Sequence, residues 1–316
     1  MRFLTIRDYV KIFIVMDIFL VAELAFLWYV FPVNEESETP PATATSSQPA
    51  PRSLPEESAD WENLRVRFNL VMGEEAKDFS LYLLRPQKES QPFLLQGSRP
   101  VRPASMIKIF IMAKAMQDVK DGRHSLDEVI VLRESDMVDG AGILSSMDEG
   151  LQLTFGKLIE LMITESDNTA TNMLIDRLGM DNINQYLRDE GYQHTQLQHK
   201  MMIGSDNAGI NLSSAEDMGR LFTRIYFHQC VNEQYDKLML QYLLAQSDRE
   251  CFPDALPYWQ IAHKTGEIEQ VYHDGGIFYG EKGDFILVIL NDNYESRYEA
   301  IEKMKLMAKV IAEYFI

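Results

Sequence analysis

Cysteine is scarce in this chain, which contains only Cys230 and Cys251 among its 316 residues. The two cysteines form no CxxC pair and no ligand cluster, so a structural zinc site is not expected. A small fold framed by disulfides is excluded by the length of the chain. The sequence also lacks GxGxxG and GxxxxGK[ST], the loops that usually hold nucleotide phosphates. We therefore expect no metal and no nucleotide cofactor.

Basic residues are outnumbered, since 30 Lys and Arg accompany 48 Asp and Glu and give a formal net charge of −18 at pH 7. A protein that binds a nucleic-acid backbone needs a basic surface that displaces counterions. The acidic balance therefore argues against nucleic acid as a partner. The remaining composition, 46% hydrophobic and 25% charged, is that of an ordinary globular protein.

Charged residues are also rare in the apolar run of residues 12–31, which as a helix of about 30 Å could cross a bilayer. Its two acids, Asp17 and Glu23, make insertion marginal on insertion scales. Bases precede the run and acids lie beyond it, namely Arg2, Arg7 and Lys11, then Glu35, Glu36 and Glu38. This positive-inside pattern predicts that residues 1–31 are a cytoplasmic tail and a single-pass anchor in the cell membrane. A cleaved signal peptide is the alternative.

Residues 32–60 differ in composition from the remainder of the chain, because they are rich in Pro, Ser, Thr and Glu and contain no glycine. We expect this segment to be an extended linker. Residues 61–316 then form a domain large enough for a sizeable core. The predicted anchor places this domain on the extracytoplasmic side of the membrane.

Within residues 61–316, apolar periodicity predicts strands near both ends and helices between them. The expected strands are 79–84, 93–96, 259–263, 272–279 and 285–291. The expected helices are 61–72, 106–119, 155–164, 168–178, 183–189, 215–226, 235–245 and 296–314, with Thr154 and Ser214 as N-caps. This order indicates an α+β fold, in which an antiparallel sheet flanked by terminal helices faces an all-helical lobe across a cleft.

The pair Ser105 and Lys108 carries the first chemical signal. Three residues apart at the start of a helix, the two side chains share one face. The surrounding sequence is apolar on all sides, so the lysine is expected to be buried and to have a lowered pKa. A neutral lysine can take a proton from the serine. A lysine that extends toward solvent beside an N-cap serine would give the same spacing.

Two further motifs come later in the chain, Ser166-Asp167-Asn168 between two predicted helices and Lys264-Thr265-Gly266 at the end of a predicted strand. In this order, Ser-x-x-Lys, Ser-Asp-Asn and Lys-Thr-Gly resemble the motifs of the penicillin-recognising serine hydrolases, and most closely those of class A β-lactamases. The resemblance covers essentially Trp61 to the C-terminus. A second Ser-Asp-Asn begins at Ser205 and is interpreted as a loop without catalytic role.

The resemblance implies a role for each motif residue. Ser105 would be the acylated nucleophile, Lys108 its base or proton shuttle, and Ser166 the relay to the leaving nitrogen. The substrate would be bound by Asn168, Lys264, Thr265 and Gly266, and the backbone N–H groups of Ser105 and Glu267 would form the oxyanion hole. Asp167 is interpreted as a structural turn residue.

The sequence departs from the family pattern at two places. The glutamate that activates the deacylating water falls in register near Met201, where residues 196–202 contain no carboxylate. Two other acids, Asp206 and Glu267, could serve as the base, but neither matches that register. The family's arginine beyond Lys-Thr-Gly is also missing, and Arg249 or His273 would have to replace it. As alternatives, these two residues are a surface charge and a strand-end histidine.

The sequence leaves three functions open. The first is a membrane-anchored, β-lactamase-like acyl-serine hydrolase that deacylates slowly, and we favour it. The second is a DD-peptidase-like or penicillin-binding enzyme that acts on peptidoglycan stem peptides. The third is a β-lactam-binding module that is acylated without turnover. The fold alone does not distinguish them.

Overall fold

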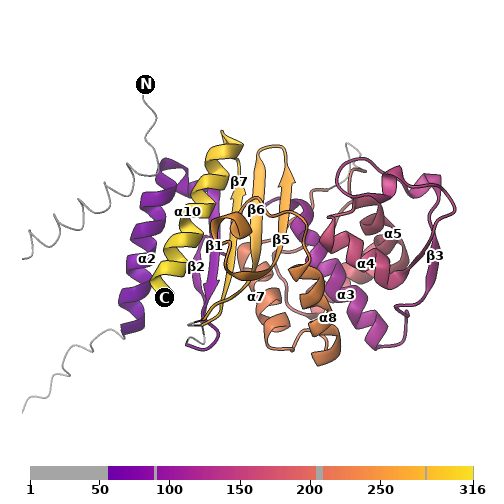
Figure 1. The fold of residues 1–316 in the computed structure, drawn as a ribbon, viewed down its shortest axis with the longest axis horizontal. Helices are drawn as coiled ribbons and strands as arrows, with labels where there is room; N and C mark the ends of the chain where they lie inside the picture. Colours follow the sequence, from indigo (N-terminus) through magenta and orange to yellow (C-terminus); the bar gives the residue numbers. More distant parts are fainter. Residues whose placement is uncertain (1–55, 89–90, 204–208, 282, 316) are drawn as a thin grey trace, which may run out of the picture. The chain divides into compact units, whose positions relative to one another are not determined.

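The computed structural model describes residues 56–315 except 89–90, 204–208 and 282 (Figure 1). The predicted anchor at residues 1–31 and most of the predicted linker lie outside the described residues. Helix α2, Glu56–Met72, begins inside the segment 32–60 that was predicted as a linker. Within the described part of the chain, no helix is both long and apolar enough to cross a membrane.

Segments from both ends of the domain build one antiparallel sheet of five strands, in the order β2-β1-β7-β6-β5. The strands are β1 Phe79–Leu84, β2 Phe93–Leu95, β5 Gln260–Ile268, β6 Val271–Tyr279 and β7 Phe285–Asp292. Leu81 pairs with Ile289, so the first strand docks beside the last. The chain therefore leaves the sheet after β2, builds the helices, and returns to complete the sheet.

Both faces of this sheet are buried. On β7, Phe285, Leu287 and Ile289 belong to the core shared with α2 and α10, Arg297–Phe315. The alternate residues, Ile286, Val288 and Leu290, belong to the core shared with the helical lobe. Because successive strand residues point to opposite faces, an unbroken apolar run gives two cores. Figure 1 accordingly shows α2 and α10 on one side of the sheet and the helical lobe on the other.

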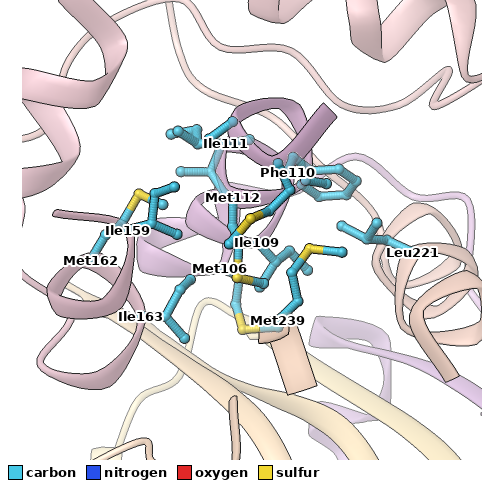
Figure 2. Packing of buried hydrophobic residues seen from close by; sticks show 14 of the residues in the cluster. Met106, Ile109, Phe110, Ile111, Met112, Ile159, Met162, Ile163, Leu221 and Met239 are labelled. Atoms are coloured by element: carbon cyan, nitrogen blue, oxygen red, sulfur yellow. The ribbon is translucent and has the colours of Figure 1, made fainter. Parts of the chain in front are cut away.

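The helical lobe is built around α3, Lys108–Lys120, whose first nine residues are all buried. Its other helices are α4 Phe155–Thr164, α5 Asn168–Leu178, α6 Met180–Asp189, α7 Ala215–Tyr226 and α8 Glu233–Leu244. Figure 2 shows α3 side chains packed among side chains such as Ile159 of α4, Leu221 of α7 and Met239 of α8. A helix that is apolar all round is buried all round, as the sequence predicted for this segment.

The predicted α+β arrangement is confirmed, and so are both predicted N-caps. Thr154 Oγ1 accepts from Lys157 N at 3.1 Å, and Ser214 Oγ accepts from Asp217 N at 3.1 Å. The elements that were not predicted include β3 Val129–Val131, β4 Gln152–Thr154 and α9 Phe252–Ala255. Elements of three or four residues are too short to show a period. Cys230 and Cys251 are both buried free thiols.

Candidate active site

Ser105 lies in a short 3-10 turn, η2, Ala104–Ile107, that leads directly into α3. The sequence predicted one helix from residue 106, whereas the structure tightens its first turn. The turn rests on strand β5 at Gly266, where a Cβ atom would lie 2.9 Å from Pro103 O and 3.0 Å from Met106 N. A side chain at 266 would therefore push the nucleophile segment off the strand. This contact is a reason for glycine that the sequence reasoning, which considered only the substrate, did not include.

Lys108 is fully buried, and its Nζ lies within hydrogen-bonding distance of three oxygen atoms of the Ser166–Asn168 motif. Lys108 Nζ donates to Ser166 O at 2.6 Å, to Ser166 Oγ at 3.2 Å and to Asn168 Oδ1 at 2.8 Å. Ser105 Oγ makes no hydrogen bond to any described residue. Burial lowers the pKa of Lys108 well below its usual value, and the charge of Lys264 lowers it further. The lysine is thus able to be neutral at moderate pH, as a base must be.

Ser166 presents its hydroxyl to a second buried lysine. Lys264 Nζ donates to Ser166 Oγ at 3.1 Å and to Thr265 O at 2.9 Å. Burial lowers the pKa of Lys264 to about 8, although Asp248 and Asp274 partly oppose the shift. Ser166 adopts a left-handed backbone conformation, with φ +53°, that few non-glycine residues adopt. The Ser166 hydroxyl is thus hydrogen-bonded to two lysines that lie far apart in the sequence, Lys108 and Lys264.

Asp167 is a structural residue, as predicted. Its buried carboxylate accepts hydrogen bonds from Ile143 N at 2.7 Å, Leu144 N at 2.8 Å and Ala170 N at 2.8 Å. These bonds cap α5 and hold the segment around residue 143 against the motif. The same closeness explains Gly142, because a Cβ there would lie 2.3 Å from Asp167 Cγ.

Both polar atoms of the Asn168 side-chain amide form hydrogen bonds. Its Oδ1 accepts from Lys108, and its Nδ2 donates to Asp139 O at 3.2 Å. These contacts hold the Asn168 side chain beside Lys108, which also contacts Ser166.

Thr265, Gly266 and Glu267 lie on β5, the edge strand next to the nucleophile turn. The sequence placed Lys264-Thr265-Gly266 at the end of a strand, whereas β5 runs on to Ile268. The Glu267 carboxylate is bound by Arg297, with Arg297 Nε 2.6 Å from Glu267 Oε1. The sequence reasoning missed Arg297, because it lies 30 residues further along, at the start of the last helix.

Comparisons with known proteins show what the chain resembles. The sequence model of the Beta-lactamase enzyme family matches residues 63–315. The chain belongs to this family. It is 25% identical over 195 residues to the β-lactamase BRO-1 of Moraxella catarrhalis, covering 60% of this chain and 59% of that one. It is 27% identical over 173 residues to a β-lactamase of Streptomyces albus G, covering 51% of this chain and 55% of that one. The chain thus aligns with less than two thirds of these relatives' length.

Among solved structures, a β-lactamase from Sphaerobacter thermophilus superposes with a TM-score of 0.74, at 24% identity over 81% of this chain and 97% of that one. PBP-A superposes with a TM-score of 0.72, at 25% identity over 80% of this chain and 96% of that one. A Leu-to-Glu mutant of PBP-A, solved as an acyl-enzyme complex with penicillin G, gives 0.72 at 26% identity. The β-lactamase-like fold is therefore shown, and so is the predicted family resemblance.

His273 does not replace the missing family arginine. It is buried between the sheet and the segment before η2, where Nε2 donates to Arg102 O at 2.7 Å and Nδ1 accepts from Asn291 N at 3.2 Å. Burial lowers the pKa of His273 to about 4, so the ring is neutral at physiological pH. The side chain is a structural link in the sheet. Arg249, the other candidate, is exposed on the loop between α8 and α9.

Met201 lies near the position at which the family register predicts a glutamate, and its backbone is hydrogen-bonded to Asn172. Its side chain is 8% exposed and packs in the core of the helical lobe. The strand-like bridge between Gln196 and Leu212 closes the loop that carries it. The second Ser-Asp-Asn, with Ser205 and Asp206, falls at residues 204–208 of this loop, outside the described residues. Glu267, the other acid considered as the base for deacylation, forms an ion pair with Arg297.

Proposed function

We propose that this protein is a β-lactamase-like acyl-serine hydrolase that opens a β-lactam amide through an acyl-enzyme on Ser105. One observation carries the proposal: the Ser166 hydroxyl lies within 3.2 Å of two buried lysines, Lys108 and Lys264. Lys108 follows Ser105 by three residues at the start of α3. Family membership supports the assignment of the nucleophile.

In the proposed acylation, neutral Lys108 removes the proton of Ser105 Oγ as that oxygen attacks the amide carbonyl carbon. The C–N bond then breaks. The proton on Lys108 passes through Ser166 Oγ to the leaving nitrogen, which restores neutral Lys108. Protonated Lys264 keeps positive potential beside this path. The backbone N–H groups of Ser105 and Glu267 are the proposed donors to the oxyanion.

The second half of the cycle, hydrolysis of the ester on Ser105, lacks its usual base. No carboxylate stands at Met201, and burial of that side chain leaves an apolar group in its place. Losing a positioned general base typically costs on the order of 10² to 10⁴ in rate. We therefore expect rapid acylation and then slow release.

A peptidoglycan-directed enzyme is the second candidate. The absence of a carboxylate at Met201 supports it, and the chain also resembles PBP-A, whose Leu-to-Glu mutant was solved as an acyl-enzyme complex with penicillin G. The substrate of such an enzyme is a stem peptide rather than a β-lactam. A binding module that is acylated without turnover is the limiting case of slow release.

Intact-mass spectrometry with a penicillin over time separates these candidates. A stoichiometric adduct that decays within minutes supports the slow hydrolase, and one that persists for hours supports the penicillin-binding enzyme or module. If a stem peptide is cleaved faster than a penicillin is released, the peptidoglycan enzyme is favoured. Absence of any adduct contradicts all three.

We also propose that residues 1–31 anchor the protein in the cell membrane and that the catalytic domain is extracytoplasmic. The support is the positive-inside pattern of the sequence. Protease added to intact cells should degrade the domain. Protection of the domain would refute this topology, and a mature N-terminus found after Ala44 would indicate a cleaved signal peptide.

A further inference from the structure

The segment that leads into the nucleophile turn is bound to the sheet through Arg102, three residues before Ser105. The carbonyl oxygen of Arg102 accepts a hydrogen bond from Nε2 of His273 on β6 at 2.7 Å. Its guanidinium binds Asp292 at the end of β7, with Arg102 Nε 3.1 Å and Nη2 2.8 Å from Asp292 Oδ1. Both the backbone and the side chain of Arg102 are therefore attached to the two neighbouring strands β6 and β7.

The two attachments of Arg102 differ in burial. The His273 side chain is 0% exposed, whereas the side chains of Arg102 and Asp292 are 38% and 21% exposed. Removing one partner of a buried hydrogen bond leaves the other polar group without solvent, and this costs more than the loss of an ion pair that water reaches. The contact with His273 is therefore the one on which we expect the segment to depend most.

The position of the Ser105 hydroxyl depends on the backbone turn that carries it, because Ser105 Oγ makes no hydrogen bond to any described residue. The preceding residue, Ala104, has a φ of +46°, a left-handed conformation that non-glycine residues rarely adopt. Such a conformation persists only where the surrounding structure holds it. His273 binds the chain before Ala104, and Gly266 lets the turn approach strand β5.

We infer that His273 is a positioning residue for acylation, which acts on Ser105 through the carbonyl of Arg102. The hydrogen bond from Nε2 keeps the turn at Ala104 in place, and this turn keeps Ser105 Oγ where Lys108 can take its proton. His273 itself takes no part in the proton transfer. The inference rests on the proposed function, because it takes Ser105 as the nucleophile.

The two ring nitrogens of His273 have different partners. A carbonyl oxygen only accepts, so Nε2 carries the proton toward Arg102 O. Nδ1 lies 3.2 Å from Asn291 N and 2.9 Å from Tyr272 O, both within the sheet. The amide nitrogen of glutamine is as many bonds from Cα as Nε2 is, and that of asparagine as many as Nδ1. His273→Gln therefore keeps a donor for Arg102, whereas His273→Asn keeps a partner only for the sheet.

The test measures acylation of the full-length protein by benzylpenicillin, followed by rapid-quench intact-mass spectrometry. A series of penicillin concentrations separates the acylation rate constant from the dissociation constant of the non-covalent complex. His273→Asn should lower the rate constant by about 10- to 100-fold, because misplacing a reacting group by about 1 Å costs on that order. The dissociation constant should change little. His273→Gln should keep most of the wild-type rate constant, which a merely structural role of His273 does not predict.

A second measurement does not depend on any reaction. Hydrogen–deuterium exchange of the amides in residues 101–107 should be faster in His273→Asn than in the wild type, because a turn that opens locally exposes its N–H groups. In His273→Gln the exchange should stay close to that of the wild type. Urea unfolding checks that each variant is folded.

Asp236→Asn is the matched control. Asp236 is also 0% exposed, and its carboxylate holds a loop backbone by accepting from Cys230 N and Val231 N, each at 2.9 Å. This variant should lower the stability of the protein to urea. It should leave both the acylation rate constant and the exchange of residues 101–107 unchanged.

The inference is overturned if His273→Gln and His273→Asn have equal acylation rate constants, or if exchange in residues 101–107 is unchanged in His273→Asn. Failure of the proposed function is a different result, because then no adduct forms on Ser105 in the wild type. In that case the exchange experiment decides on its own whether His273 holds the turn.

Discussion

Asn172 and Met201 hold each other through two hydrogen bonds: Met201 N donates to Asn172 Oδ1 at 2.8 Å, and Asn172 Nδ2 donates to Met201 O at 2.9 Å. Asn172 belongs to α5, the helix that begins at Asn168 of the second motif. The backbone at position 201 is therefore fixed relative to the catalytic group, whatever side chain it carries. Near the predicted position of the base, a backbone held by Asn172 thus carries a buried methionine and not a carboxylate.

This geometry makes Met201→Glu the direct test of slow deacylation. We expect the wild type to show a burst with a chromogenic cephalosporin and then slow release, because acylation keeps its base Lys108 while deacylation has none. A glutamate on the fixed backbone should speed release by up to about 10² to 10⁴. The upper end of this rate increase is reached only if the glutamate carboxylate can hydrogen-bond the water that attacks the ester.

Met201→Gln is the control for this experiment, since it has the same size as glutamate but no basic carboxylate. It should release the adduct at the wild-type rate. If the wild type turns over steadily at hundreds per second with no burst, another residue supplies the base and slow release is wrong.

Ser105→Ala should abolish covalent adduct formation with a penicillin, whereas Ser205→Ala should leave it intact. Only a serine beside a desolvated base is deprotonated near neutral pH, and of Ser105 and Ser205 only Ser105 lies three residues before the buried Lys108. Lys108→Ala should slow acylation by on the order of 10² to 10⁴. An adduct that survives Ser105→Ala, located by peptide mapping, would show that the nucleophile is assigned wrongly.

The rate of acylation by a penicillin should follow a bell-shaped pH profile. The rising limb reflects deprotonation of Lys108, whose pKa burial lowers well below its usual value. The falling limb, near pH 8, reflects loss of the charge on Lys264. Because both lysines contact Ser166, the two apparent pKa values belong to the pair. Stopped-flow acylation across pH 5 to 11 measures the profile.

Lys264→Arg separates the two limbs, because a guanidinium stays charged throughout this range. The falling limb should then disappear while the rising limb remains. A wild-type rate that keeps increasing beyond pH 10 would mean that the charge of Lys264 does not contribute to acylation.

The sequence predicted most of the fold because its long elements show clear periods. Strand β1 was predicted with its bounds, as were α4, α5 and α7. The 3-10 turn that carries Ser105 was missed, and so was its contact with Gly266, a residue distant in sequence. Periodicity within one segment contains no information about such a contact.

The sequence predicted the site residues that belong to a motif. It did not predict the site contacts that form between residues far apart in the chain. Ser-x-x-Lys, Ser-Asp-Asn and Lys-Thr-Gly predicted the residues that meet around Ser166. No local pattern indicated that Arg297 would join Glu250 to Glu267, since ion pairs between distant surface residues leave no trace in spacing. The neutral, structural role of His273 likewise follows only from its burial beside Arg102.

Asp167→Ala should destabilise the protein more than it alters the chemistry. The substitution leaves the N–H groups of Ile143, Leu144 and Ala170 without their acceptor, and each buried N–H left unpaired costs about 1 kcal/mol or more. We expect a loss of about 2 to 4 kcal/mol in the free energy of unfolding, measured with urea.

Gly142→Ala should act through the same contact, because its Cβ would lie 2.3 Å from Asp167 Cγ at a φ of +114°. Gly150→Ala is the control, since Gly150 has a similar φ of +90° but nothing within 4 Å of its Cβ position. Gly142→Ala should therefore cost more than Gly150→Ala, and the excess should persist when Asp167 is already alanine, because the backbone Cα of residue 167 also lies 2.5 Å from the Cβ position. Equal costs at the two glycines would mean that backbone strain alone, and not the packing of Asp167, requires glycine at 142.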